Sequence, residues 1–149
     1  MCGVSIKDSI VGIVGAGRIG IAIIERLIGF KPKLILYNGN ERKEKADSLG
    51  AHYVSLNKLL EESDFVIVCC ALTEKTHQMF NSEAFKRMKN SAIFINTSRG
   101  GVVDQNALYQ ALNNGEIKGA GLDVMNPEPI SDDDPLLSLN NVGMYHVSS

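Results

Sequence analysis

A glycine-rich turn between an apolar segment and a helical pattern constrains this chain more than any other part of it. Residues 11–20 read VGIVGAGRIG, which places Gly15, Gly17 and Gly20 at the spacing GxGxxG directly after an apolar run. In such a turn the first glycine permits the sharp bend, the second lets a pyrophosphate approach the backbone, and the third lets the helix pack closely on the strand. The free N–H groups at the start of the helix attract phosphate. The motif therefore predicts a dinucleotide-binding strand, turn and helix, with the mobile positive charge of Arg18 beside it.

The residues around the motif favour this interpretation over an ordinary strand, turn and helix. Residues 11–14 form an apolar run, as expected for a strand that is buried on both faces of a parallel sheet. Ile19, Ile23 and Leu27 recur at helical spacing, which predicts the buried face of the helix that follows. The order of strand, glycine turn and helix is the one that a dinucleotide site requires.

Two rival nucleotide-binding patterns fail. Residues 12–17 have the spacing of a Walker loop, but Arg18 and Ile19 stand where that loop needs Lys and Ser or Thr. The short-chain dehydrogenases are disfavoured as well, because no tyrosine of this chain has a lysine four residues later.

Composition bounds the class of protein. The 149 residues are enough for one domain with a sizeable core, and the formal net charge of −2 comes with no basic cluster that would suggest nucleic acid. No segment has transmembrane length, and residues 1–9 are too polar for a signal peptide. Cys2, Cys69 and Cys70 form no CxxC pair, so we interpret them as reduced, buried, structural thiols and predict no metal site. We expect a soluble cytoplasmic protein that binds neither nucleic acid nor membrane.

Apolar runs alternate with helical patterns along the rest of the chain. Beyond residues 11–14, strands are predicted over residues 33–37, 52–54, 65–70, 92–95 and 119–124. Beyond the helix that starts near Arg18, helices are predicted over residues 41–49, over residues 56–62 after the cap Ser55, and from the cap Asp104 to Gly115, with Leu108, Ala111 and Leu112 buried. Such alternation implies parallel βαβ units. We predict an α/β fold of Rossmann type, with a doubly wound parallel sheet in a single three-layer domain over residues 1–149, and functional residues at the carboxyl ends of the strands.

The segment after the second predicted strand bears on the choice of cofactor. NAD-binding units usually end this strand with Asp or Glu, whose carboxylate accepts hydrogen bonds from the ribose hydroxyls. Here the segment reads YNGNERK, in which Asn38 or Asn40 can donate to a 2′-phosphate and Arg42 or Lys43 can neutralise it. This pattern favours NADP. NAD stays possible, because Glu41 could reach the ribose.

Three side chains in the later loops have the chemistry to reduce a 2-oxo acid. Arg99 offers a planar fork for a carboxylate, His146 changes protonation near neutral pH, and Glu128 could raise the pKa of that imidazole and orient it. Together they would bind the substrate and supply a proton as hydride arrives. The alternative is that all three are solvated surface residues. His52 and His77 lack an obvious acidic partner and are interpreted as incidental.

Several segments, taken in order after the glycine motif, resemble the successive motifs of the D-isomer-specific 2-hydroxyacid dehydrogenases. They are residues 70–73 (CALT) with Thr76, residues 94–100 (FINTSRG), and residues 119–124 (GAGLDV) with Glu128 and Pro129. Within this family the similarity is greatest to the branch that reduces glyoxylate and hydroxypyruvate, and it includes residues 36–39 and 106–112. The resemblance extends from about Ile10 to His146.

The resemblance implies reduction of glyoxylate or hydroxypyruvate by hydride transfer from NADPH, in a homodimer formed through the nucleotide domain. It implies that Arg99 binds and polarises the substrate, that His146 is the acid–base histidine, and that Glu128 is its partner. The implied cofactor contacts are Gly15, Ala16, Gly17, Arg18 and Ile19 at the pyrophosphate, Asn40 and Arg42 with Asn38 at the 2′-phosphate, Leu72 and Thr73 on the adenine side, Asp123 at the nicotinamide carboxamide, and Thr97.

The chain also departs from the family pattern. Tyr145 and Ser148 stand where the family has Pro before and Gly after the histidine. The family's substrate domain uses a long N-terminal segment and a C-terminal helix, and we expect both to be absent from a truncated product. A second class of function is therefore a catalytically silent NADP-binding module that senses redox state or pairs with a full-length subunit. A third resembles the family's transcriptional corepressors.

Overall fold

Seven parallel strands form one sheet in the computed structural model, which describes residues 5–144. The strands are β1 (Ile10–Val14), β2 (Leu34–Asn38), β3 (His52–Tyr53), β4 (Phe65–Val68), β5 (Ile93–Asn96), β6 (Gly119–Leu122) and β7 (Val142–Met144). The helices are α1 (Arg18–Leu27), α2 (Lys43–Ser48), α3 (Leu56–Glu62), α4 (Ser82–Arg87) and α5 (Gln105–Asn113), with 3₁₀ turns at Ile28–Phe30, Gly100–Val102 and Pro135–Ser138.

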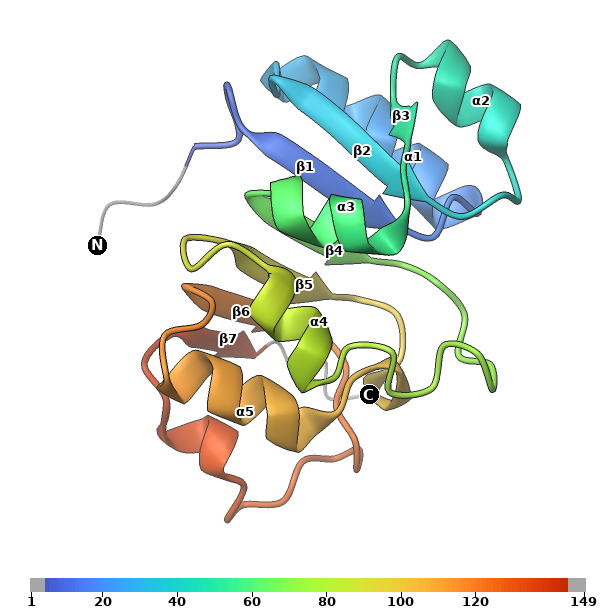
Figure 1. Ribbon diagram of the computed structural model, residues 1–149. Coiled ribbons are helices and arrows are strands. Elements are labelled where there is room, and N and C mark those ends of the chain that lie inside the picture. The colour runs from blue at the N-terminus through green and yellow to red at the C-terminus, as the bar shows by residue number, and fades with distance from the viewer. Residues whose placement is uncertain (1–4, 145–149) are drawn as a thin grey trace.

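The strand order is β3-β2-β1-β4-β5-β6-β7, and every neighbouring pair is parallel. The chain runs outward from β1 in one direction through β2 and β3, and then in the other direction from β4 to β7 (Figure 1). The order therefore reverses at β1 and β4. In sheets of this kind, ligands bind beyond the carboxyl ends of the strands at the reversal.

Helices cover both faces of the sheet. One apolar cluster joins the sheet to Leu59 of α3, Phe85 of α4 and Leu108 of α5. The other cluster lies on the opposite face, where Ile21 and Ile24 of α1 pack on β1 and β2. Figure 1 shows α3, α4 and α5 together on one side of the sheet and α1 behind it. The predicted α/β, doubly wound, three-layer architecture is confirmed.

Asp64 ties the amino ends of three strands together. Its carboxylate accepts hydrogen bonds from the backbone N–H of Ile10 on β1 and from Lys89 Nζ, each at 2.8 Å, and its backbone carbonyl accepts one from Ile93 N on β5. Burial alone would raise the pKa of Asp64, but the bonds from Ile10 and Lys89 outweigh burial and hold this pKa below its usual value. The ionised carboxylate is thus a structural element of the sheet.

Most predicted elements are confirmed, including the helix at Leu56–Glu62 with its Ser55 cap. Asp104 also caps its helix as predicted, through bonds from Asn106 N and Ala107 N, and Gly115 follows that helix with φ of +70°. Several elements differ from the prediction by one or two residues at their ends, three of them as follows. The helix predicted from residue 41 begins at residue 43, the strand predicted to reach residue 70 ends at residue 68, and the strand predicted to residue 124 ends at residue 122. The sequence patterns did not predict the short α4 and β7.

The prediction for the buried face of the first helix is wrong for Ile19 and confirmed for Leu27. Ile19 is 62% exposed and Ile23 only partly buried, whereas Gly20, Ile24 and Leu27 face the sheet. α1 is apolar on two adjacent stripes, so periodicity alone does not choose between them. The close approach of Gly20 to the turn selects the stripe that contains Gly20 and directs Ile19 outward.

Within residues 5–144, none of the helices combines the length and the apolar character needed to cross a membrane.

Candidate functional site

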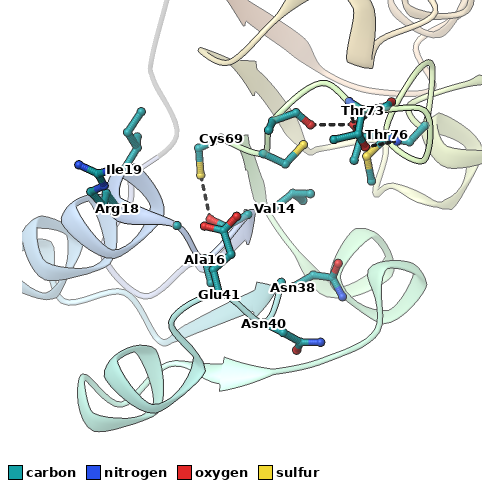
Figure 2. Close-up of a pocket in the computed structure, with 16 residues that line it drawn as sticks. Val14, Ala16, Arg18, Ile19, Asn38, Asn40, Glu41, Cys69, Thr73 and Thr76 are labelled. Carbon is teal, nitrogen blue, oxygen red and sulfur yellow. Dashed lines mark hydrogen bonds between the residues drawn. The ribbon is translucent and has the colours of Figure 1, made fainter.

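A cavity of about 650 Å³ opens at the carboxyl ends of β1, β2 and β4. Its walls come from the glycine turn, from the segment that follows β2, and from residues after β4. Figure 2 shows these three segments converging, with Ala16 on the glycine turn, Cys69 after β4 and Glu41 after β2. The cavity lies where the strand order reverses, as expected for a ligand site in this fold.

The glycine turn is built to let a ligand approach the backbone. Gly15 has φ of +108°, and a Cβ there would lie 2.7 Å from the backbone nitrogen of Cys70. Gly17 precedes α1, and no side chain caps that helix end. The N–H groups of the first turn of α1 therefore keep their capacity to bind an anion. A dinucleotide pyrophosphate fits this donor set, with Arg18 as an added cation on the cavity wall.

Two cysteines line the cavity directly beside the glycine turn. Cys69 Sγ donates a hydrogen bond to the carbonyl oxygen of Gly15 at 3.2 Å. Burial, with a smaller effect of Cys70, raises the pKa of the Cys69 thiol to about 12, and burial raises the pKa of Cys70 as well. Both thiols are free, but they are partly exposed to the cavity rather than fully buried in a strand.

The segment after β2 lies close against the glycine turn. Asn38 Nδ2 donates to the carbonyl oxygen of Val54 at 2.9 Å, which commits one amide donor to the protein. Gly39 has φ of +126°, and a Cβ there would lie 2.9 Å from Ala16 N, so this position requires glycine. Asn40 and Glu41 follow and both line the cavity.

A second cavity of about 430 Å³ adjoins the first and shares Ile19, Cys69, Cys70 and Ala71 with it. The exposed side chains of Ile19 and Leu72 supply apolar surface, and Thr97, Ser98 and Arg99 complete the lining. A ligand that is bound at the glycine turn can therefore extend through the adjoining cavity to the loop after β5.

Arg99 is held in this loop by a buried polar network. Asn96 Nδ2 donates to the carbonyl oxygen of Arg99 at 3.1 Å, and Asn96 Oδ1 accepts from the backbone and hydroxyl of Ser98. Asn96 is 1% exposed, so these bonds fix the loop from inside the core. The guanidinium itself is exposed, and among residues 5–144 its one acceptor is the Ser98 carbonyl, at 2.7 Å.

The structure brings together most of the predicted site residues. Those that line one or both cavities are Gly15, Ala16, Gly17, Arg18, Ile19, Asn38, Asn40, Leu72, Thr73, Thr97 and Arg99. Arg42, Asp123 and Glu128 are exposed and line neither cavity. His146 lies outside the described residues. Asp123 follows β6 directly, and its backbone N–H donates to the carbonyl of Asn96 at 3.0 Å.

Several cavity residues were not predicted to bind the cofactor. They include Gly39, Cys69, Cys70, Thr76 and Met79 in the first cavity and Ser98 in the second, whereas Glu41 was named only for the NAD alternative. Their position soon after β2, β4 or β5 is the signal that could have found them, since ligands gather at those strand ends. Among residues 5–144 no group of three or more His, Cys, Asp or Glu side chains is arranged to hold a metal.

The sequence of this chain is similar to those of known proteins from one family. A sequence profile described as D-isomer specific 2-hydroxyacid dehydrogenase, NAD binding domain, matches residues 1–147. A glyoxylate reductase of Korarchaeum cryptofilum is 52% identical over 142 residues, which are 95% of this chain and 43% of the relative. A glyoxylate reductase/hydroxypyruvate reductase of Mus musculus is 48% identical over 151 residues, 100% of this chain and 46% of the relative.

The fold comparison agrees. The crystal structure of a D-isomer specific 2-hydroxyacid dehydrogenase from Lactobacillus delbrueckii ssp. bulgaricus, in its NAD complexed form, matches with a TM-score of 0.88 at 29% sequence identity. The match covers 96% of this chain and 47% of that one. The chain thus spans less than half the length of these relatives. Because the profile covers nearly the whole chain and the two glyoxylate reductase relatives share about half of its residues, the chain belongs to the D-isomer specific 2-hydroxyacid dehydrogenase family.

Proposed function

We propose that this chain contributes the dinucleotide site and the substrate arginine to the reduction of a 2-oxo acid such as glyoxylate or hydroxypyruvate. The observation that carries the proposal is the pair of adjoining cavities, one over the glycine turn and one beside Arg99. A dinucleotide in the first would extend toward the second, where the guanidinium can hold the carboxylate of an oxo acid. The relatives named as glyoxylate reductases support the substrate class.

In this mechanism each side chain has a separate task. The turn at Gly15 and Gly17 binds the pyrophosphate through backbone N–H groups, and the bound dinucleotide supplies the hydride. Arg99 orients the oxo acid and polarises its carbonyl. The prediction for His146 is that its imidazolium gives a proton to the new alkoxide, with Glu128 holding the imidazole charged.

The preference for NADPH stays a prediction. The position of Asn40 supports it, whereas the positions of Asn38 and Arg42 support it less. Asn40 lies on the cavity wall, where its amide can donate to a 2′-phosphate. One donor of Asn38 is already bonded to Val54, and Arg42 is exposed outside the lining. The solved relative from Lactobacillus delbrueckii is in its NAD complexed form, which supports NAD as the alternative.

A second candidate function is a dinucleotide-binding module without catalysis. The described residues contain a cavity at the glycine turn, and of the two predicted catalytic residues that the structure describes, Arg99 lines a cavity and Glu128 does not. Such a module would sense redox state or pair with a longer subunit. For both candidate functions we propose a homodimer that forms through this domain, and a cytoplasmic location. Sedimentation of the purified chain tests the homodimer.

An assay of turnover distinguishes the enzyme from the binding module without catalysis. We expect oxidation of NADPH or NADH by glyoxylate or hydroxypyruvate, and loss of that activity in Arg99→Ala and His146→Gln. Arg26→Ala is the matched control, because Arg26 is exposed and its guanidinium, within the part of the chain that the structure describes, bonds to Ala22 of its own helix alone. Dinucleotide binding without turnover would overturn the enzymatic proposal for this chain and support the module. Binding of neither dinucleotide would refute both.

A further inference from the structure

Asn96 is a buried polar residue at the carboxyl end of β5. It is 1% exposed, and alternation along the strand puts it on the same face as Phe94, which belongs to the apolar cluster that joins the sheet to α3, α4 and α5. An amide without hydrogen bonds costs free energy in such surroundings. The bonds that Asn96 makes therefore explain why an amide, and not an apolar side chain, ends this strand.

Both ends of the Asn96 amide bond to the loop that carries Arg99. Oδ1 accepts from the backbone N–H of Ser98 at 3.1 Å and from its hydroxyl at 3.0 Å, and Nδ2 donates to the carbonyl oxygen of Arg99 at 3.1 Å. These partners fix the orientation of the amide, because a backbone N–H can only donate and a carbonyl oxygen can only accept. The side chain at this position must therefore offer a donor and an acceptor together.

These bonds tie Arg99 to the sheet. The Arg99 carbonyl also accepts from Val102 N at 3.3 Å, but that bond lies inside the 3₁₀ turn at Gly100–Val102 and moves with the loop. Among residues 5–144, the hydrogen bonds that join the backbone of Ser98 or Arg99 to a strand are those from Asn96. The place of the arginine relative to the strands thus depends on one side chain.

The backbone of Asn96 is a rigid base for these bonds. It pairs with Val68 on β4 and with Leu122 on β6. Its carbonyl oxygen accepts a further bond at 3.0 Å from the backbone N–H of Asp123, the residue after β6. Figure 1 shows β5 between β4 and β6, away from both edges of the sheet. A side chain that starts from this place has little freedom to move.

We propose that Asn96 is the positioning residue for the substrate arginine, and that its amide holds the backbone of Ser98 and Arg99 so that the guanidinium meets the carboxylate of the oxo acid in the second cavity. The inference rests on the proposed reduction of a 2-oxo acid. Asn96 lines neither cavity, so it acts through Arg99 and not on the substrate. A site of this kind needs such support, because a displacement of about 1 Å can lower the rate about a hundredfold.

Steady-state reduction of glyoxylate by the 149-residue chain tests the proposal. Asn96→Ala should lower kcat/KM on the order of tenfold or more. It should leave the calorimetric dissociation constant of the dinucleotide nearly unchanged, because the glycine turn contains none of the Asn96 bonds. Asn96→Asp keeps the shape and the acceptor but loses the donor when ionised, so it should show the same loss. Asn90→Ala is the matched control, since Asn90 precedes β5, donates to the Gly115 carbonyl at 3.0 Å, and lines neither cavity.

Backbone order parameters from NMR measure the restraint directly. The amides of Ser98 and Arg99 in the wild-type protein should have values of about 0.85, as in a rigid sheet, and values below about 0.6 in Asn96→Ala. Asn90→Ala should keep the wild-type values at both amides. The wild-type measurement needs no variant, so a folding defect cannot mask the result.

The outcomes distinguish this inference from the proposed function. A wild-type chain that binds a dinucleotide but reduces neither glyoxylate nor hydroxypyruvate overturns the proposed reduction, and this inference with it. If the wild type is active and a folded Asn96→Ala chain keeps its kcat/KM, the role of Asn96 alone is refuted. That role is refuted equally if the Ser98 and Arg99 amides of the wild type are flexible, or if Asn96→Ala weakens the dinucleotide by the same factor, because the loss would then belong to the whole fold.

Discussion

Replacing Gly20 with alanine tests the close contact between α1 and the glycine turn. A Cβ on Gly20 would overlap the carbonyl oxygen of Gly15, which is a backbone atom and cannot rotate out of the way. Either α1 or the turn must shift, and because the clash is with a backbone atom the cost of overpacking lies at the upper end of its usual range, about 2–3 kcal/mol. Alanine recovers about 1 kcal/mol through its higher helix propensity. We expect a net loss of about 1–2 kcal/mol, which lowers Tm by roughly 3–6 °C in a chain of this size.

Urea unfolding followed by circular dichroism measures the loss, and a thermal scan checks it independently. Gly29→Ala is the control, because a Cβ on Gly29 meets no atom within 4 Å. That variant should be at least as stable as the wild-type protein. A Gly20→Ala chain as stable as the wild type would show that the turn yields without cost, and the reasoning about the third glycine of the motif would be wrong.

Two further predictions concern ionisable groups. Asp64→Asn should lose about 1–2 kcal/mol in urea unfolding at pH 7, because it removes the ionised acceptor of Ile10 N and Lys89. Since folding lowers the pKa of Asp64, its contribution exists above the unfolded value of 3.8 and disappears as pH falls through the folded value, so the gap between variant and wild type should close below pH 4. For Cys69, a thiol pKa of about 12 predicts alkylation by iodoacetamide at pH 8 that is much slower in the folded chain than in urea. Mass spectrometry of the Cys69 peptide measures both rates, and equal rates would contradict the burial argument.

Local signals carried the prediction of the fold. The apolar runs at residues 11–14 and 65–68 need no partner to be recognised, because a strand buried on both faces is apolar throughout. Ser55 and Asp104 mark helix starts for an equally local reason, since a cap bonds to the N–H groups two or three residues ahead. β7 escaped prediction because it has three residues and gains its identity only by pairing with β6.

Some features of the candidate site could likewise be predicted from the sequence, and others could not. The cluster of residues at the carboxyl ends of β1, β4 and β5 was predictable, because parallel strands bring these ends to one edge. It was less predictable which side chains at that edge face a ligand. Arg42 and Glu41 are adjacent in sequence, yet only Glu41 lines the cavity, and the packing of Gly39 on Ala16 is what positions them.

The amino-acid sequence by itself determined the class of fold and the place of the dinucleotide turn, since periodicity, caps and glycine spacing act within a few residues of the chain. Only the tertiary structure decided that Ile19 faces the cavity and that the Glu41 carboxylate lies over Gly17. Both outcomes depend on how closely neighbouring elements approach each other. That approach is set by the packing of α1 and of the segment after β2 against the turn, and the spacing of apolar residues does not encode it.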